Sequence, residues 1–160
     1  MAFDAFLKLE GVKGSAMAKG FEKEIPILSF SIGGINTRSS AETGAGAGKG
    51  QVQDFSLMKY TDKASPTLFQ ACLSGQHFPK ASITLRKAGG TQIPYLTFDL
   101  EEVFITSFQQ SGSSGSDVPN DSFSLSFAKI ETTYQPQDAK GNKDGEAIVG
   151  AWDVHAVATK

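Results

Sequence analysis

The chain contains one cysteine among its 160 residues, and this scarcity limits both its redox chemistry and its metal chemistry. A single thiol, Cys72, cannot form a disulfide within the chain, so packing or assembly has to stabilise the fold. The two histidines, His77 and His155, have no second imidazole or cysteine nearby at metal-ligand spacing. We therefore expect no metal site and no cofactor.

The chain also lacks a large excess of positive or negative charge. Lysine and arginine number 15 against 17 aspartates and glutamates, so the formal net charge is −2 and no broad basic field attracts nucleic acid. The first residues are partly apolar, but Asp4, Lys8 and Glu10 interrupt them, which fits neither a secretory signal peptide nor a membrane-spanning helix. We expect one domain over residues 1–160 that neither binds nucleic acid nor inserts into a membrane.

Catalytic groupings are lacking as well. Glu101 and Glu102 are adjacent, so along a strand they point to opposite faces and cannot flank one substrate bond. The segment GAGAGKG resembles a phosphate loop, but Thr43 stands where glycine is needed and Gly50 where serine or threonine should follow the lysine. No Gly-x-Ser-x-Gly nucleophile elbow occurs. We expect no catalytic residue, and assembly or binding is a better class than an enzyme.

The sequence does contain a clear alternation of apolar and polar residues, which is typical of half-buried strands. The predicted strands cover residues 3–10, 28–32, 51–60, 81–87, 95–108, 122–127 and 148–157. Glu101 and Glu102 break the alternation, which predicts a bulge or bend within the fifth of these strands. Residues 109–121 and 135–146 are rich in turn-forming and polar residues, and we expect loops there.

One helix is predicted over residues 65–74. Ser65 can cap its start, Pro66 fits the first turn, and Gly75 can end it. The predicted apolar stripe consists of Leu68, Phe69, Cys72 and Leu73. A thiol buried in such a stripe is expected to be inert. Together these elements predict a mainly β fold: a single β-barrel of two packed, largely antiparallel sheets, with one short flanking helix and a long extended loop.

That long loop covers residues 33–50, with the sequence GGINTRSSAETGAGAGKG. Glycine and small polar residues dominate it, so it cannot build a core of its own. Doubled back as a ribbon it could reach roughly 30 Å, enough to touch a neighbouring molecule. We therefore predict an arm between subunits or between rings of subunits. The residues assigned to this contact are Gly33, Gly34, Ile35, Asn36, Arg38, Glu42 and Lys49.

Serines occupy the polar phase of two predicted strands, at positions 29, 31, 122, 124 and 126. They form either an ordinary hydrated sheet face or a smooth wall on which a macromolecule binds weakly. Both interpretations fit the sequence.

Four segments closely resemble the haemolysin-coregulated (Hcp) proteins of the type VI secretion system. They are FDAFLKLEGVKG at 3–14, ILSFSIGG at 27–34, VQDFSLMKYTDKASPTLFQACLSGQHFPKASITLRKAGG at 52–90 and TTYQPQDAKGNKDG at 132–145. The block KYTDKASPTLFQACLSGQHFPKA and the YQP followed by KDG are the most specific parts of the match. The resemblance runs almost from end to end.

This resemblance implies a tube protein. Subunits would form homohexameric rings that stack into an inner tube, which a contracting sheath expels. The implied partners are further copies of the chain, the VgrG spike protein, the sheath and baseplate proteins, and effectors in the lumen. Assembly in the bacterial cytoplasm would be followed by secretion without a signal peptide. Within this picture we assign Ser29 and Ser31 to effector contact in the lumen, Ser31 first because it adjoins the arm.

Two other classes stay open at this point. One is a monomeric secreted β-sandwich module that binds carbohydrate or protein, although Tyr60, Tyr95, Tyr134 and Trp152 are too scattered to suggest a single stacking platform. The other is a small hydrolase on a β scaffold, which the missing catalytic cluster disfavours. Only the tube interpretation demands a defined ring of identical chains.

Overall fold

The computed structural model describes residues 2–37, 49–89 and 92–159. In chain order the elements are β1 (Phe3–Leu9), β2 (Ile25–Ile27), β3 (Ser29–Ser31), β4 (Gly34–Thr37), β5 (Lys49–Val52), β6 (Phe55–Tyr60), α1 (Ser65–Ser74), β7 (His77–Lys87), β8 (Pro94–Ser111), β9 (Asn120–Ser126), β10 (Lys129–Tyr134) and β11 (Ile148–Asp153). The mainly β class with one short helix is confirmed.

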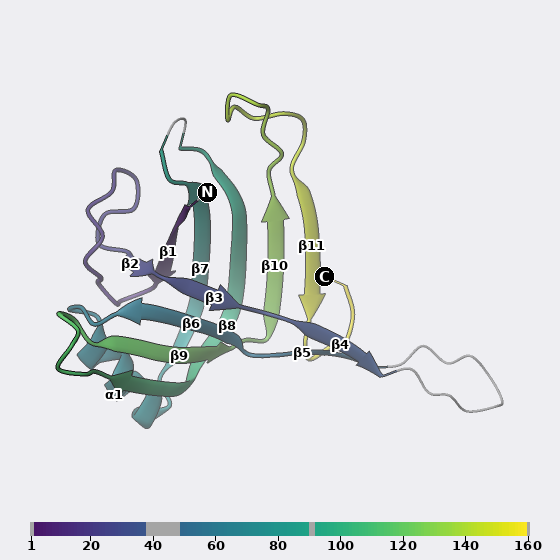
Figure 1. Ribbon diagram of the computed structural model, residues 1–160. Helices are drawn as coiled ribbons and strands as arrows, with labels where there is room; N and C mark the ends of the chain where they lie inside the picture. The colour runs from purple at the N-terminus through teal and green to yellow at the C-terminus, as the bar shows by residue number, and fades with distance from the viewer. Residues whose placement is uncertain (1, 38–48, 90–91, 160) are drawn as a thin grey trace.

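Nine of the strands form one antiparallel sheet that bends into two layers (Figure 1). The strand order is β2-β1-β7-β8-β9-β6-β3, with β10 beside β8 and β11 beside β10. In Figure 1 strands β1, β7, β10 and β11 stand upright, while β9, β6 and β3 cross below them. The 18-residue β8 belongs to both layers, because its first part pairs with β10 and its last part with β9.

The bend in β8 falls where the sequence predicts it. Glu102 has a φ of 57°, in the left-handed region that is rare for a residue with a side chain. Glu101 still pairs with Lys129 of β10, whereas Phe104 pairs with Ser126 of β9. Across the bend, the imidazole of His77 contacts the Glu102 carboxylate. The predicted irregularity at Glu101 and Glu102 is therefore confirmed.

The sheet does not form the expected closed barrel. Its two end strands, β2 and β3, follow one another along the chain through Leu28, whose N–H donates to the Met58 carbonyl (2.8 Å). Within the described residues β2 and β3 share no ladder, so hydrogen bonds do not close the sheet and the single barrel is not confirmed. The two expected sheets are two layers of one bent sheet. Alternation in the sequence indicates which face of the sheet a residue occupies. It does not indicate whether the two end strands pair to close the sheet into a barrel.

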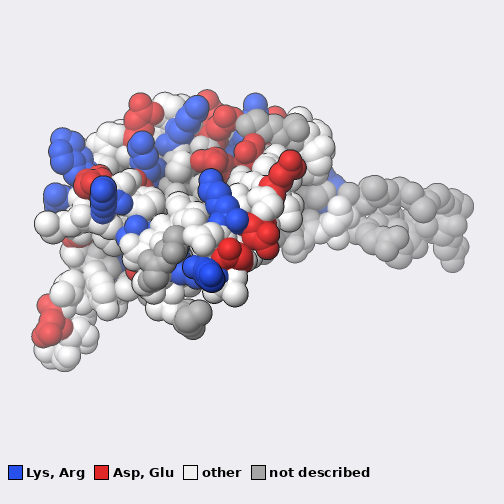
Figure 2. Space-filling model, turned by 90° about the horizontal axis from the view of Figure 1, so that it is seen from above, with Lys and Arg blue, Asp and Glu red and all other residues white. Residues whose placement is uncertain are grey.

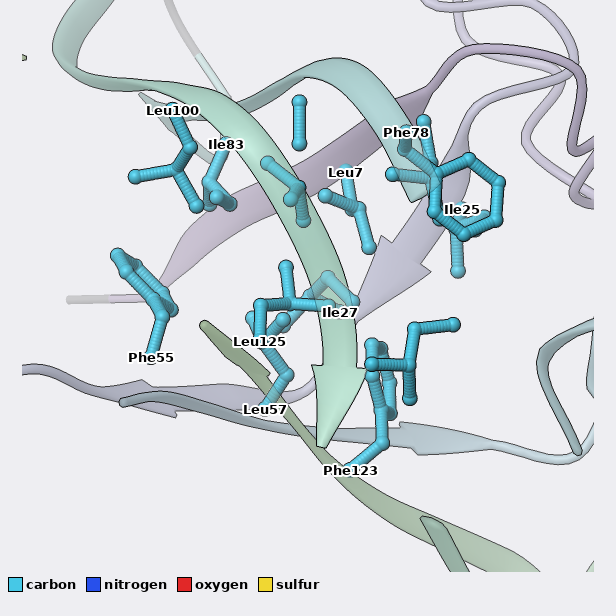
Figure 3. Packing of buried hydrophobic residues seen from close by; sticks show 14 of the residues in the cluster. Leu7, Ile25, Ile27, Phe55, Leu57, Phe78, Ile83, Leu100, Phe123 and Leu125 are labelled. Carbon is cyan, nitrogen blue, oxygen red and sulfur yellow. The ribbon is translucent and has the colours of Figure 1, made fainter. Parts of the chain in front are cut away.

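The core lies between the two layers (Figure 3). Leu7 and Ile83 come from the upright layer, and Leu57 and Leu125 come from the crossing layer; all four are fully buried. Phe55 packs against Phe30 and Phe98, with ring centroids 5.9 and 5.1 Å apart. The apolar phase of the strands therefore fills the space between the layers, and the polar phase of each layer faces outward.

Several strand boundaries differ from the predictions. The strand predicted at 51–60 divides into β5 and β6, and β11 ends at Asp153 before the predicted end at 157. The loop predicted over 109–121 is shorter, since β8 continues to Ser111 and β9 begins at Asn120. The sequence analysis missed β10, whose residues are half-buried almost throughout and so show no alternation.

The helix covers the predicted residues, but its faces and its cap differ. The N-cap position is Ala64, without a side-chain capping bond, and Ser65 is buried with its hydroxyl turned to other partners. The predicted stripe is half right: Leu68 is buried and Cys72 packs against the core, but Phe69 and Leu73 are 51% and 74% exposed. The Cys72 thiol is only partly buried. Gly75, with a φ of 68°, ends the helix as predicted.

Candidate functional site

The outward face of the crossing layer forms an open groove of about 830 Å³. Strand register places its residues in two rows that run across β3, β6, β9 and β8. The first row is Ser29, Met58, Ser122 and Gln109, and the second is Ser31, Ser56, Ser124 and Ser107. All eight are exposed or half-buried, and all eight line the groove. We call these two rows the serine wall.

The hydroxyls of the wall are linked to one another. Ser107 Oγ lies 2.5 Å from Ser124 Oγ, which lies 2.8 Å from Thr106 Oγ1, and Thr106 donates to Asp54 Oδ2 (2.7 Å). A carboxylate only accepts, so the single Thr106 proton goes to Asp54 and the Ser124 hydroxyl donates to Thr106. The chain of hydrogen bonds therefore runs from Ser107 to the Asp54 carboxylate.

The structure brings together most of the serines that the sequence singled out. Ser29, Ser31, Ser122 and Ser124 meet in the groove, whereas Ser126 lies beyond the bulge in β8 and outside the groove lining. The sequence analysis missed Ser56, Met58, Ser107 and Gln109. For Ser56 and Met58 a signal existed, because they alternate with buried residues in FSLMKY. The assignment of Ser29 and Ser31 to a tube lumen stays a prediction.

The predicted arm begins and ends as a two-stranded ribbon that projects from the body of the molecule (Figure 1). Strand β4 pairs with β5 in antiparallel register, from Gly34 opposite Val52 to Thr37 opposite Lys49. Ile35 is exposed on the ribbon. Gly33, Gly34, Ile35, Asn36 and Lys49 are thus placed at its base and along its strands, while Arg38 and Glu42 lie outside the described residues.

The ribbon rests on the chain's own last strand, at Gly50 opposite Asn36. A Cβ built on Gly50 would lie 3.1 Å from Cζ2 of the Trp152 ring, so glycine allows the ribbon to approach β11 this closely. A cavity of about 290 Å³ beside this contact is lined by Val52, Ile130 and Trp152 among others. Contacts with β11 of the same subunit therefore fix the direction in which the arm projects from the body.

A buried group of charges anchors the wall to the helix. Lys59 on β6 and Asp121 on β9 have fully buried side chains, with Lys59 Nζ 2.9 Å from Asp121 Oδ2. Lys59 Nζ also lies 2.7 Å from Asp62 Oδ1 and donates to Ser65 Oγ (2.8 Å). The Ser65 hydroxyl in turn donates to Asp121. This network joins β6, β9 and the first turn of α1, and its Lys59, Asp62 and Ser65 lie within the most specific family-like block.

The network also sets the protonation of Asp121. Burial raises the pKa of the Asp121 carboxyl, but hydrogen bonds from Ser65, Lys59, Thr61 and Gln110 outweigh burial and leave the pKa below its ordinary value. The folded protein therefore favours the charged carboxylate.

Elsewhere the surface carries charges of both signs. Figure 2 shows lysine and arginine interspersed with aspartate and glutamate over the visible face, without a broad area of one sign. Among the described residues no group of three potential ligands could hold a metal ion. No helix in the described part of the chain is long and apolar enough to cross a bilayer.

Comparison with known proteins identifies the family of this serine-walled sheet. A family model described as "Type VI secretion system effector, Hcp" matches residues 6–134. The chain belongs to the Hcp family. Protein hcp1 of Pseudomonas aeruginosa is 43% identical over 156 residues, which cover 96% of each chain. The Major exported protein of the same organism is 25% identical over 171 residues, covering 93% of this chain and 99% of that protein.

Solved structures of Hcp proteins share the whole fold. A structure described as a type six secretion system protein superposes with a TM-score of 0.93 at 28% identity, covering 99% of this chain and 100% of that one. Hcp1 from Salmonella typhimurium superposes with a TM-score of 0.83 at 30% identity over the full length of both chains. The family resemblance read from the sequence is confirmed. Hcp proteins are structural, secreted components of the type VI system, so the chain is not an enzyme.

We predict that Asp121→Asn lowers the free energy of unfolding by about 3 kcal/mol near neutral pH, because buried Lys59 loses a charged partner. The lowered pKa of Asp121 contributes stability that is present above the ordinary carboxyl range, near pH 4, and is lost as the pH falls through the folded-state pKa. The variant should therefore lose less of its remaining stability on acidification. Urea unfolding across this pH range measures both effects.

The control for this prediction is Asp117→Asn, which removes an exposed carboxylate from the loop between β8 and β9. It should change stability by less than about 0.5 kcal/mol. Equal losses in the two variants would contradict the penalty that we assign to burying Lys59 without its partner Asp121.

Proposed function

We propose that the chain forms hexameric rings that stack into the inner tube of a type VI secretion system, and that the serine wall lines the lumen and carries effectors. The serine wall is the observation that carries this proposal. It is a continuous hydroxyl-rich face with one charged residue, Asp54, in its described lining. Such a face stays hydrated and binds a passing polypeptide weakly, as a conduit requires.

Ring closure is supported by two unlike apolar surfaces. Strand β11 pairs with β10 on one side only among the described strands, and its Ile148 and Val149 are 65% and 55% exposed. The helix presents Phe69 and Leu73, and in Figure 1 α1 and β11 lie toward opposite sides of the molecule. A head-to-tail ring joins two different patches of each subunit, and it also covers an otherwise open strand edge.

Stacking of rings is supported by the ribbon formed by β4 and β5. It projects from the body, and its side chains are exposed from Gly34 to Thr37. Within the subunit the ribbon contacts Trp152 at Gly50 of β5, and the exposed side of β4 would gain contacts from another subunit or the next ring. Ordering such a segment costs about 1–2 kcal/mol per residue, which contacts with a neighbour must offset.

Family membership supports the remaining partners. These are the VgrG spike protein, the contractile sheath and the baseplate proteins, with effector proteins in the lumen. The proposal places assembly in the bacterial cytoplasm, followed by secretion to the outside or into a target cell. An Hcp relative known as the Major exported protein is consistent with this route.

Size-exclusion chromatography with light scattering should show a particle with the mass of six chains. Val149→Lys should shift it toward smaller species, because a charge enters the apolar edge of β11. The matched control, Val118→Lys, changes an exposed valine in the loop between β8 and β9 and should leave the particle intact. Monomers of the unaltered chain over a wide range of protein and salt concentrations would instead support a solitary binding module.

Hydrogen exchange should distinguish single rings from stacked tubes. The amides of β4 (Gly34–Thr37) and β5 (Lys49–Val52) should exchange more slowly in tubes, since stacking gives the ribbon its second partner. The amides of β1 (Phe3–Leu9) serve as the internal control and should be equally protected in both states. Equal protection of the ribbon in rings and tubes would remove it from the stacking contact.

Ser31→Tyr should reduce stabilisation of a co-expressed effector while ring formation, followed by electron microscopy, is retained. Ser31 is exposed in the groove, so the larger side chain occupies volume that the cargo would use. Ser113→Tyr places the same side chain on an exposed loop and should leave effector binding unchanged. Loss of rings in the Ser31 variant would place this residue in a subunit interface.

A further inference from the structure

The serine wall is not uniform along β6. Asp54, Ser56 and Met58 lie in the outward phase of this strand and its approach, alternating with buried Phe55 and Leu57. Within the described groove lining Asp54 is the one charged side chain, and Met58, 42% exposed, is the one large hydrophobic side chain that is exposed. Along this line the groove lining therefore runs from the anionic Asp54, just beside the serine wall, through Ser56 to the apolar Met58.

Asp54 is held in a fixed orientation. Its Oδ2 accepts the Thr106 hydroxyl (2.7 Å), at the end of the hydrogen-bonded chain that starts at Ser107. No lysine or arginine within residues 2–37, 49–89 and 92–159 forms an ion pair with Asp54. A carboxylate that is already oriented loses little further freedom when it meets a cation, which favours binding.

Met58 offers a different kind of contact at the other end. Its unbranched thioether side chain adapts to many apolar partners. Met58 lies four positions after Asp54, which corresponds to about 13 Å along an extended chain. An extended polypeptide also places residues i and i+4 on one face at this spacing, so a single segment can reach both side chains.

We propose that Asp54 and Met58 select the effector segments that the wall retains: extended segments with a lysine or arginine side chain for Asp54 and an aliphatic side chain, four residues away, for Met58. This inference rests on the proposed function, because it assumes that the wall faces cargo. One exposed ion pair and one apolar contact bind weakly, but a ring repeats them on every subunit, and linked weak contacts strengthen retention without slowing release at each site.

The probe is the blocked peptide acetyl-Lys-Ser-Gly-Ser-Leu-amide, titrated into the assembled protein labelled at the methionine ε-methyl groups and observed by NMR. The methyl signal of Met58 should shift saturably, while that of the highly exposed Met17, outside the groove, should not. A peptide with glutamate for lysine, and one with serine for leucine, should each bind more weakly.

Asp54→Asn keeps the shape of the side chain and removes its charge, and should weaken binding of the lysine peptide about two- to fivefold, the range of one exposed ion pair. The matched control, Glu10→Gln, removes an exposed carboxylate outside the groove and should leave the affinity unchanged. Equal binding of the lysine and glutamate peptides, unchanged affinity in Asp54→Asn, or no shift of Met58 would overturn the inference.

These outcomes separate the inference from the proposed function. If rings and tubes form and Ser31→Tyr blocks the effector while Asp54→Asn binds the peptide normally, the tube function stands and the selectivity proposal fails. If no rings form, both the tube function and this inference fail.

Discussion

An 18-residue strand is far longer than most strands of globular proteins, and β8 serves two layers by bending at Glu102. The bend lets one strand hydrogen-bond to β10 in one layer and to β9 in the other. Two layers of a single sheet can then face each other across one core. Their outer faces become independent surfaces, and one of them is free to carry the serine wall.

Buried charges hold the strands of the wall against the first turn of α1. Lys59 and Asp121 sit on β6 and β9, the two central strands of the wall, and Ser65 connects them to the helix. A buried ion pair adds little net stability over apolar packing, but it strongly penalises any arrangement that separates its members. The network therefore fixes how the wall strands and the helix sit together more than it fixes how stable they are.

Much of this fold can be predicted from the sequence, and the failures have physical causes. Alternation identifies strands where one face is buried and the other is more exposed, as in β9, and it fails for β10, which is half-buried almost throughout. The apolar stripe of α1 is partly wrong because the buried face of the helix follows Ser65, Leu68 and Ala71, which leaves Phe69 and Leu73 exposed. Glycine composition identifies the arm, but only the structure reveals its seat on Trp152.

The candidate site is likewise predictable from the sequence only in part. Serine alternation on two strands predicts which residues are outward, but their assembly into one surface depends on the register of β3, β6, β9 and β8, which no local pattern encodes. Strand register also decides where the residues other than serine, such as Met58, lie on this surface. In the tube that we propose, a wall of serines alone would treat all polypeptides alike, and Asp54 and Met58 would be the positions that give it a preference without altering the core beneath them.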